Sequence, residues 1–69
     1  MKKAIGILHF PDNEAESLTI YYNGAQEYIT AENNQTVENM EYRAEDESDA
    51  KEAARAMYRV WPWIYEELH

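Results

Sequence analysis

Cysteine is absent from this sequence of 69 residues. Without it the chain has neither disulfides nor thiolate ligands for zinc, and this composition fits a reducing cytoplasm. A chain of this length forms one small domain, 1–69, which buries only about 60% of its unfolded surface. We therefore expect stability to come from side-chain packing, for which six tyrosines, two tryptophans and Phe10 supply apolar area.

Residues that could act as nucleophiles or general bases are scarce. The two histidines, His9 and His69, fall into no recognisable arrangement with a nucleophile and an orienting acid. We expect His9 to be a strand residue. The acidic segment 12–16 lacks the twelve-residue spacing and the central glycine of an EF-hand. The sequence therefore predicts a protein that is not an enzyme and holds no metal or cofactor.

Long apolar runs are also missing. The apolar run that follows Lys2 and Lys3 ends before Pro11. It is too short for the core of a secretory signal and far too short to span a bilayer. We interpret it as a first strand, and we expect a cytoplasmic protein that does not associate with membranes.

Basic residues are nearly absent from the segment 12–49, which holds eleven acids and Arg43 alone. The formal net charge of −8 arises in this segment, because Lys2 and Lys3 offset only part of it and residues 50–69 are balanced. One-signed charge costs folding free energy through self-repulsion, and it attracts basic surfaces. It also repels phosphate, whose contacts dominate nucleic-acid affinity. We expect a basic protein surface as the partner, and no direct binding of nucleic acid.

Alternation of apolar and β-branched residues predicts up to four strands: 4–10, 17–22, the segment after Asn23-Gly24, and 36–44. Asn23-Gly24 is the strongest turn signal, since both residues tolerate positive φ. A two-residue loop would pair Ile20 with Glu27, and a three-residue loop would pair Ile20 with Tyr28. We favour the three-residue loop because it keeps the glutamate out of the core.

The C-terminal third predicts a helix that starts at a cap provided by Asp46 or Ser48. Its apolar positions have helical spacing and form one face: Ala50, Ala53, Ala54, Met57, Trp61, Ile64 and Leu68. A stripe of bases lies opposite: Lys51, Arg55 and Arg59. Pro62 lacks a backbone donor and clashes with the preceding turn, so a kink is expected there.

We therefore predict the α+β class. The expected architecture is a three- to four-stranded antiparallel meander, packed by one C-terminal helix that is kinked near Pro62. Met40 and Tyr42 should point inward from the last strand. The basic stripe of the helix should screen the acids of the sheet or meet the rim of a partner.

The acids are densest from Glu45 to Asp49, where the last strand meets the helix. Part of this charge serves the helix start. Glu38 and Glu41 belong to the strand and should point to opposite faces if the strand is regular. Trp63 lies off the apolar helix face, so it either covers an edge of the sheet or anchors an interface. The candidate partner-binding residues are Glu38, Glu41, Glu45, Asp46, Glu47, Asp49 and Trp63.

The small size, the Asn23-Gly24 hairpin, the acids between Asp12 and Asp49 and the aromatic C-terminal helix together resemble the small acidic inhibitors encoded by phages. Anti-CRISPR proteins and other DNA mimics belong to this group. The resemblance implies an inhibitor that occupies a DNA-binding or PAM-reading channel of a CRISPR effector, in the host cytoplasm. Such channels are strongly basic.

The alternative is a small regulatory or antitoxin-like interaction domain that binds a basic protein through the aromatic helix. A monomer and a homodimer are compatible with either interpretation.

Overall fold

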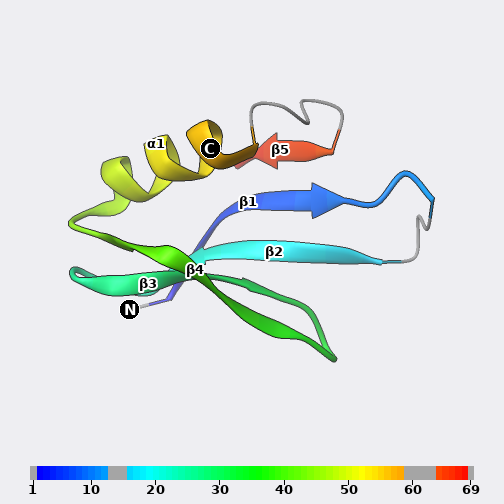
Figure 1. Cartoon of the computed structure of the whole chain (residues 1–69), viewed down its shortest axis with the longest axis horizontal. Helices are drawn as coiled ribbons and strands as arrows, with labels where there is room; N and C mark the ends of the chain where they lie inside the picture. Colours follow the sequence, from blue (N-terminus) through cyan, green and yellow to red (C-terminus); the bar gives the residue numbers. More distant parts are fainter. Residues whose placement is uncertain (1, 13–15, 59–63, 69) are drawn as a thin grey trace.

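The computed structural model describes residues 2–12, 16–58 and 64–68 of the chain (Figure 1). Its elements, in order, are β1 (Lys3–His9), β2 (Ser17–Tyr22), β3 (Glu27–Glu32), β4 (Val37–Ala44), α1 (Glu47–Tyr58) and β5 (Tyr65–Glu67). The strands form one antiparallel sheet in the order β4-β3-β2-β1-β5. The α+β class and the meander of the first four strands are confirmed, but the sheet has more strands than the three to four expected.

The additional strand, β5, forms where the sequence predicts helix. The backbone N–H of His9 donates to the carbonyl of Ile64 at 2.6 Å, and the N–H of Leu68 donates to the carbonyl of Ile5 at 3.0 Å. Ile64 and Leu68 therefore belong to the sheet edge and not to the helix face. This pairing satisfies backbone groups of β1 that would otherwise lie along an open edge. Pro62, where the kink is predicted, lies outside the described residues.

The β2–β3 hairpin has a longer connection than the sequence predicts. Ile20 pairs with Ala31. Both expected pairings, with Glu27 and with Tyr28, are therefore wrong. The hairpin itself is present, and the prediction that Ile20 points into the core is confirmed, since it is fully buried.

The side chain of Asn23 explains the wider connection. Its Nδ2 donates to the carbonyl of Tyr28 at 2.8 Å and lies 3.1 Å from Oγ1 of Thr30. Asn23 thus bridges to β3 and is not a central turn residue. Positive φ occurs at Gly24 (127°), one of the two residues expected to adopt it, and also at Gln26 (66°).

One face of the sheet carries the core and is covered by α1, which packs against β1, β2, β4 and β5. The buried residues are Ile5, Leu8, Leu18, Ile20, Ile29, Ala31, Ala44, Ala50 and Ala54. Ala50 and Ala54 have small side chains, which lets the helix backbone lie close to the sheet. Met57 is 37% exposed, so its expected place in the core is wrong. Within the described part of the chain, no helix is long and apolar enough to cross a membrane.

Tyr65 holds β5 against the sheet. Its ring lies so close to Gly6 that a Cβ built on that glycine would be 2.6 Å from the ring. The ring also stacks on Tyr58, with centroids 5.5 Å apart. Burial raises the pKa of the Tyr65 phenol to about 12, and the charge of Glu67 adds to the effect. Glycine at position 6 is thus explained by close packing with β5.

β4 is irregular where it passes Ile29, because the segment 40–42 lies opposite that one residue. Met40 packs against the core, as predicted. Tyr42 is 39% exposed, so the prediction that it points inward is wrong. Tyr42 lies on the side of the sheet that α1 covers, since its hydroxyl reaches Asp49 of α1, but its side chain remains exposed there.

Candidate functional site

The start of α1 uses two of the predicted partner-binding acids. Oδ1 of Asp46 accepts a hydrogen bond from the backbone N–H of Asp49 at 2.8 Å, so Asp46 caps the helix and Ser48 does not. The carboxylate of Asp49 in turn accepts the backbone N–H of Glu45 at 2.9 Å. Both carboxylates lie near the positive end of the helix dipole. Asp46 and Asp49 therefore have a structural task.

Asp49 also binds a side chain of β4. The hydroxyl of Tyr42 donates to the Asp49 carboxylate, at 2.8 Å from Oδ1 and 3.1 Å from Oδ2. This hydrogen bond is the main cause of a raised pKa of the Tyr42 phenol, with smaller contributions from desolvation and from the charges of Asp49, Glu45 and Glu52. At the junction of β4 and α1, one carboxylate thus binds the exposed Tyr42, and the charges of two more act on its phenol. We call Tyr42, Glu45, Asp49 and Glu52 the acidic corner.

Two members of the acidic corner are absent from the residues predicted from the sequence. Glu52 follows Asp49 by three positions, a spacing that places both on the same side of a helix, so the sequence carries a signal for it. Tyr42 carries no such signal, because alternation along the strand predicts an inward position for it.

Glu47 is directed to cations of the molecule itself. One carboxylate oxygen lies 2.7 Å from Nζ of Lys3 in β1, and the other lies 3.7 Å from Nζ of Lys51. The hydrogen bond from Lys3 is the main cause of a lowered pKa of the Glu47 carboxyl. Glu47 therefore joins the helix start to the sheet and is not part of the acidic corner.

Two bases of the helix stripe, Lys51 and Arg55, also form ion pairs within the molecule. Nε of Arg55 lies 2.8 Å from Oε1 of Glu67 in β5, and Lys51 pairs with Glu47. The expectation that these bases screen acids of the sheet is confirmed for Arg55, whereas Lys51 pairs with an acid of its own helix. Arg59, the third base of the stripe, lies outside the described residues.

Glu38 and Glu41 lie in β4, before Tyr42, and both are exposed. Glu38 pairs with the buried Ala31, so it lies on the face that α1 covers. There its charge adds to burial in raising the pKa of the Tyr58 phenol. Glu41 lies within the bulge. Neither Glu38, Glu41 nor Glu45 forms an ion pair within residues 2–12, 16–58 and 64–68.

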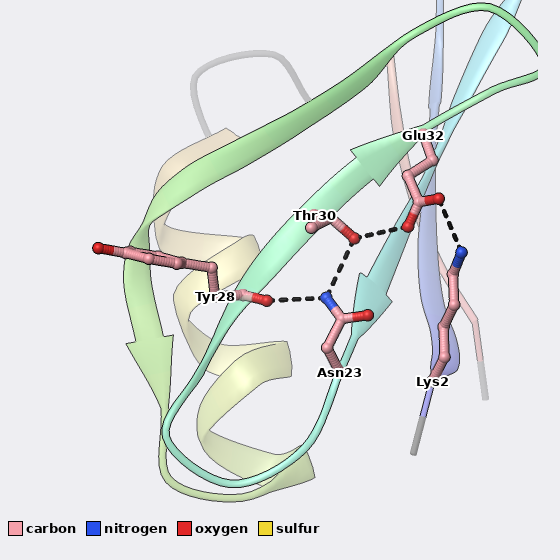
Figure 2. A network of polar contacts seen from close by, with 5 residues as sticks. All are labelled: Lys2, Asn23, Tyr28, Thr30 and Glu32. Atoms are coloured by element: carbon pink, nitrogen blue, oxygen red, sulfur yellow. Dashed lines mark hydrogen bonds and ion pairs between the residues drawn. The ribbon is translucent and has the colours of Figure 1, made fainter.

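The face of the sheet opposite α1 carries a network of polar contacts (Figure 2). Nζ of Lys2 lies 2.7 Å from Oε1 of Glu32, and the hydroxyl of Thr30 donates to Oε2 of Glu32 at 2.8 Å. These two hydrogen bonds, the one from Lys2 first, lower the pKa of the Glu32 carboxyl. Asn23 joins the same network through Thr30.

Two cations of this face lie over aromatic rings. Lys2 Nζ is 4.3 Å from the centre of the Tyr21 ring, and Arg43 is 4.6 Å from the centre of the Tyr28 ring. Such contacts stabilise the cation where it lies. Arg43, the one base of the segment 12–49, is thus held against Tyr28.

A polar hollow of about 340 Å³ opens at the end of the sheet away from the acidic corner. Its lining residues are Glu16, Ser17, Thr19, Glu32, Asn33, Asn34 and Gln35. The lining holds no histidine, and Asn33 Oδ1 already accepts the backbone N–H groups of Gln35 and Thr36. In the described part of the chain, no group of three or more histidine or acidic side chains is arranged to hold a metal ion.

The structure therefore brings together Glu45, Asp46 and Asp49 of the predicted residues at the start of α1. Glu47 pairs with Lys3 and Lys51 instead, and Glu38, in β4, lies opposite Ala31. Trp63 lies outside the described residues. No protein-family model matches the chain, and the searches of curated proteins and of solved structures find no significant match either.

Proposed function

We propose that this protein is a non-enzymatic acidic inhibitor that binds a basic, nucleic-acid-binding protein surface through the acidic corner. In the anti-CRISPR-like form of the proposal, the surface is the DNA-binding channel of a CRISPR effector. The observation that supports it best is the exposed Tyr42, which is bound by the Asp49 carboxylate and lies within the field of Glu45 and Glu52. Tyrosine is a frequent hot-spot residue of protein interfaces.

The corner can hold negative charge at fixed positions. Asp49 is fixed by hydrogen bonds from the Glu45 backbone and the Tyr42 hydroxyl. A fixed carboxylate loses less conformational entropy on binding than a free side chain does. Its field also speeds the encounter with a basic surface at low ionic strength.

Among the described residues, no base forms an ion pair with the carboxylates of the corner. Lys3 and Lys51 contact Glu47, Arg55 contacts Glu67, and Arg43 lies over Tyr28. A guanidinium or ammonium group from a partner is therefore the natural complement of Glu45 and Glu52. Binding through the aromatic C-terminal segment depends on Trp63 and stays a prediction from the sequence.

The test is a competition experiment with purified, guide-loaded CRISPR effectors of several types and a fluorescent double-stranded DNA target. The corner variant carries Glu45→Lys and Glu52→Lys and keeps the structural acids Asp46 and Asp49. The control variant carries Asp12→Lys and Glu16→Lys, exposed acids that lie outside the corner, and it changes the net charge by the same amount.

We expect the wild type and the control variant to displace DNA from a susceptible effector, and the corner variant to fail. Displacement should weaken steeply as salt is raised. If both variants lost DNA displacement equally, the total charge would determine binding and the acidic corner would not. Absence of displacement from every effector would contradict the anti-CRISPR-like form of the proposal.

A further inference from the structure

β4 forms one edge of the sheet, and no strand lies beyond it in the described part of the chain. It is eight residues long, whereas β5 at the other edge has three. An edge strand presents unpaired backbone N–H and C=O groups that can pair with another chain. The identity of the side chains along β4 determines which chain is suitable.

The backbone groups that face outward can be assigned from the ladder. The N–H of Asn33 donates to the carbonyl of Thr36 at 2.9 Å, which makes these two residues a hydrogen-bonded pair. Hydrogen-bonded and non-hydrogen-bonded pairs alternate along an antiparallel ladder. In the regular part of the β3–β4 ladder, the backbone of Glu38 therefore faces β3, and the backbones of Val37 and Asn39 face outward.

The side chains make this edge acidic with one apolar contact point. Val37 is 66% exposed, and Glu38 and Glu41 are exposed as well. Glu38 lies on the α1 side of the sheet, opposite Ala31, and Val37 lies on the other side, opposite Glu32. The bulge at 40–42 interrupts the regular edge, which limits a new ladder to a short segment.

We propose that the β4 edge binds a short, extended, basic segment of the partner as an added strand. The inference rests on the proposed function and specifies how the partner is engaged. Charge complementarity selects this occupant, since lysine or arginine next to Glu38 would neutralise it. A second copy of the chain would bring Glu38 and Glu41 against like charges, which is destabilising across strands. The matching segment alternates basic and β-branched residues, with the β-branched side chains beside Val37.

The first arm of the test uses a fluorescent, acetylated peptide of alternating lysine and valine, and its binding is followed by fluorescence anisotropy. A second peptide has the same sequence with every backbone amide N-methylated, so it keeps the charge and loses the strand donors. We expect the N-methylated peptide to bind about tenfold more weakly or worse, because each lost main-chain hydrogen bond weakens binding severalfold.

The second arm changes the protein. Val37→Pro removes one outward N–H without removing a bond to β3, and proline is tolerated at such edge positions. It should weaken binding of the unmodified peptide about fivefold to tenfold. Val37→Thr keeps the N–H and the β-branched shape, so its affinity should stay within about twofold of the wild type.

Equal binding of the two peptides would overturn strand addition and leave the proposed function intact, because a purely electrostatic contact would remain. Failure of both peptides to bind would also overturn it, and the DNA competition experiment would still decide the proposed function separately. A concentration-dependent dimer in light scattering that Val37→Pro abolishes would identify a second copy as the occupant and would equally overturn it.

Discussion

β4 and β5 are the two edges of one sheet and both carry glutamates, but the glutamates have different surroundings. In β5, Glu66 lies 3.0 Å from Nε2 of His9, and Glu67 lies 2.8 Å from Nε of Arg55. In β4, Glu38 and Glu41 form no ion pair with any described residue. The number of acids in a segment therefore does not identify a binding surface. What matters is whether the molecule already supplies their cations.

The same contrast holds within the acidic run of the sequence. Asp46 and Asp49 hold the start of α1 through hydrogen bonds to backbone N–H groups. Glu45, between strand and helix, contributes its backbone N–H to this arrangement while its side chain is exposed. Substitutions should therefore separate acids that stabilise the fold from acids that are available to a partner.

The largest effect on stability is expected at the β5 edge. Gly6→Ala would place a Cβ within 2.6 Å of the Tyr65 ring, and overpacking of this kind costs about 1–3 kcal/mol. Urea unfolding followed by tryptophan fluorescence measures the loss. Val37→Ala at the β4 edge is the control and should change the free energy of unfolding by less than about 0.5 kcal/mol. If Gly6→Ala and Val37→Ala lowered the free energy of unfolding by similar amounts, the β5 edge would not be packed more tightly than the β4 edge.

A smaller effect is expected at the helix start. Asp46→Ala removes the cap and should destabilise the protein by about 1 kcal/mol, whereas Asp46→Asn, which retains an acceptor, should lose much less. Thermal unfolding followed by circular dichroism measures both. Glu45→Ala should have little effect on stability. If Glu45→Ala were as destabilising as Asp46→Ala, Glu45 would not be available for a partner.

Acidification should reveal the acids that pair within the molecule. The pKa values of Glu32 and Glu47 are lowered from 4.5 in the folded protein, so their contribution to stability is present above pH 4.5 and is lost as the pH falls through the folded values. The difference in urea midpoint between the wild type and the variant with Glu32→Gln and Glu47→Gln should shrink from pH 7 to pH 3. If the difference in urea midpoint stayed constant from pH 7 to pH 3, Glu32 and Glu47 would not stabilise the fold through their ion pairs.

The smallest effect is expected for the pair of His9 and Glu66. Both side chains are at least half exposed, and exposed pairs contribute about 0–1 kcal/mol. A double-mutant cycle with His9→Gln and Glu66→Gln should give a coupling energy below about 0.5 kcal/mol at pH 7. A coupling above 1 kcal/mol would show that β5 is held mainly by this pair, and not by the packing of Tyr65 against Gly6.

The parts of the fold that depend on local chemistry could be predicted from the sequence. Asp46 was one of two candidate caps, because a cap needs only an acceptor side chain before a helical segment. The β5 strand could not be predicted, since its three residues are extended only because β1 offers them an edge. The β2–β3 register was missed because the Asn23 side chain contacts β3 and widens the connection.

The candidate site was predictable to a similar degree. Glu45 and Asp49 were found because they belong to the densest run of acids. Glu52 lies outside that run, and alternation along a regular strand predicts an inward position for Tyr42. Its exposure depends on how α1 packs over the sheet, and the sequence of β4 alone does not contain that information.

The most direct test of the account is a nuclear magnetic resonance titration of the isotope-labelled protein with the unmodified lysine–valine peptide. We predict that amide shifts concentrate on the segment 37–45 and on Asp49 and Glu52, and that they diminish as salt is raised. Shifts concentrated instead on β5 or on the polar hollow around Glu32 would contradict the claim that β4 and the acidic corner form the binding surface.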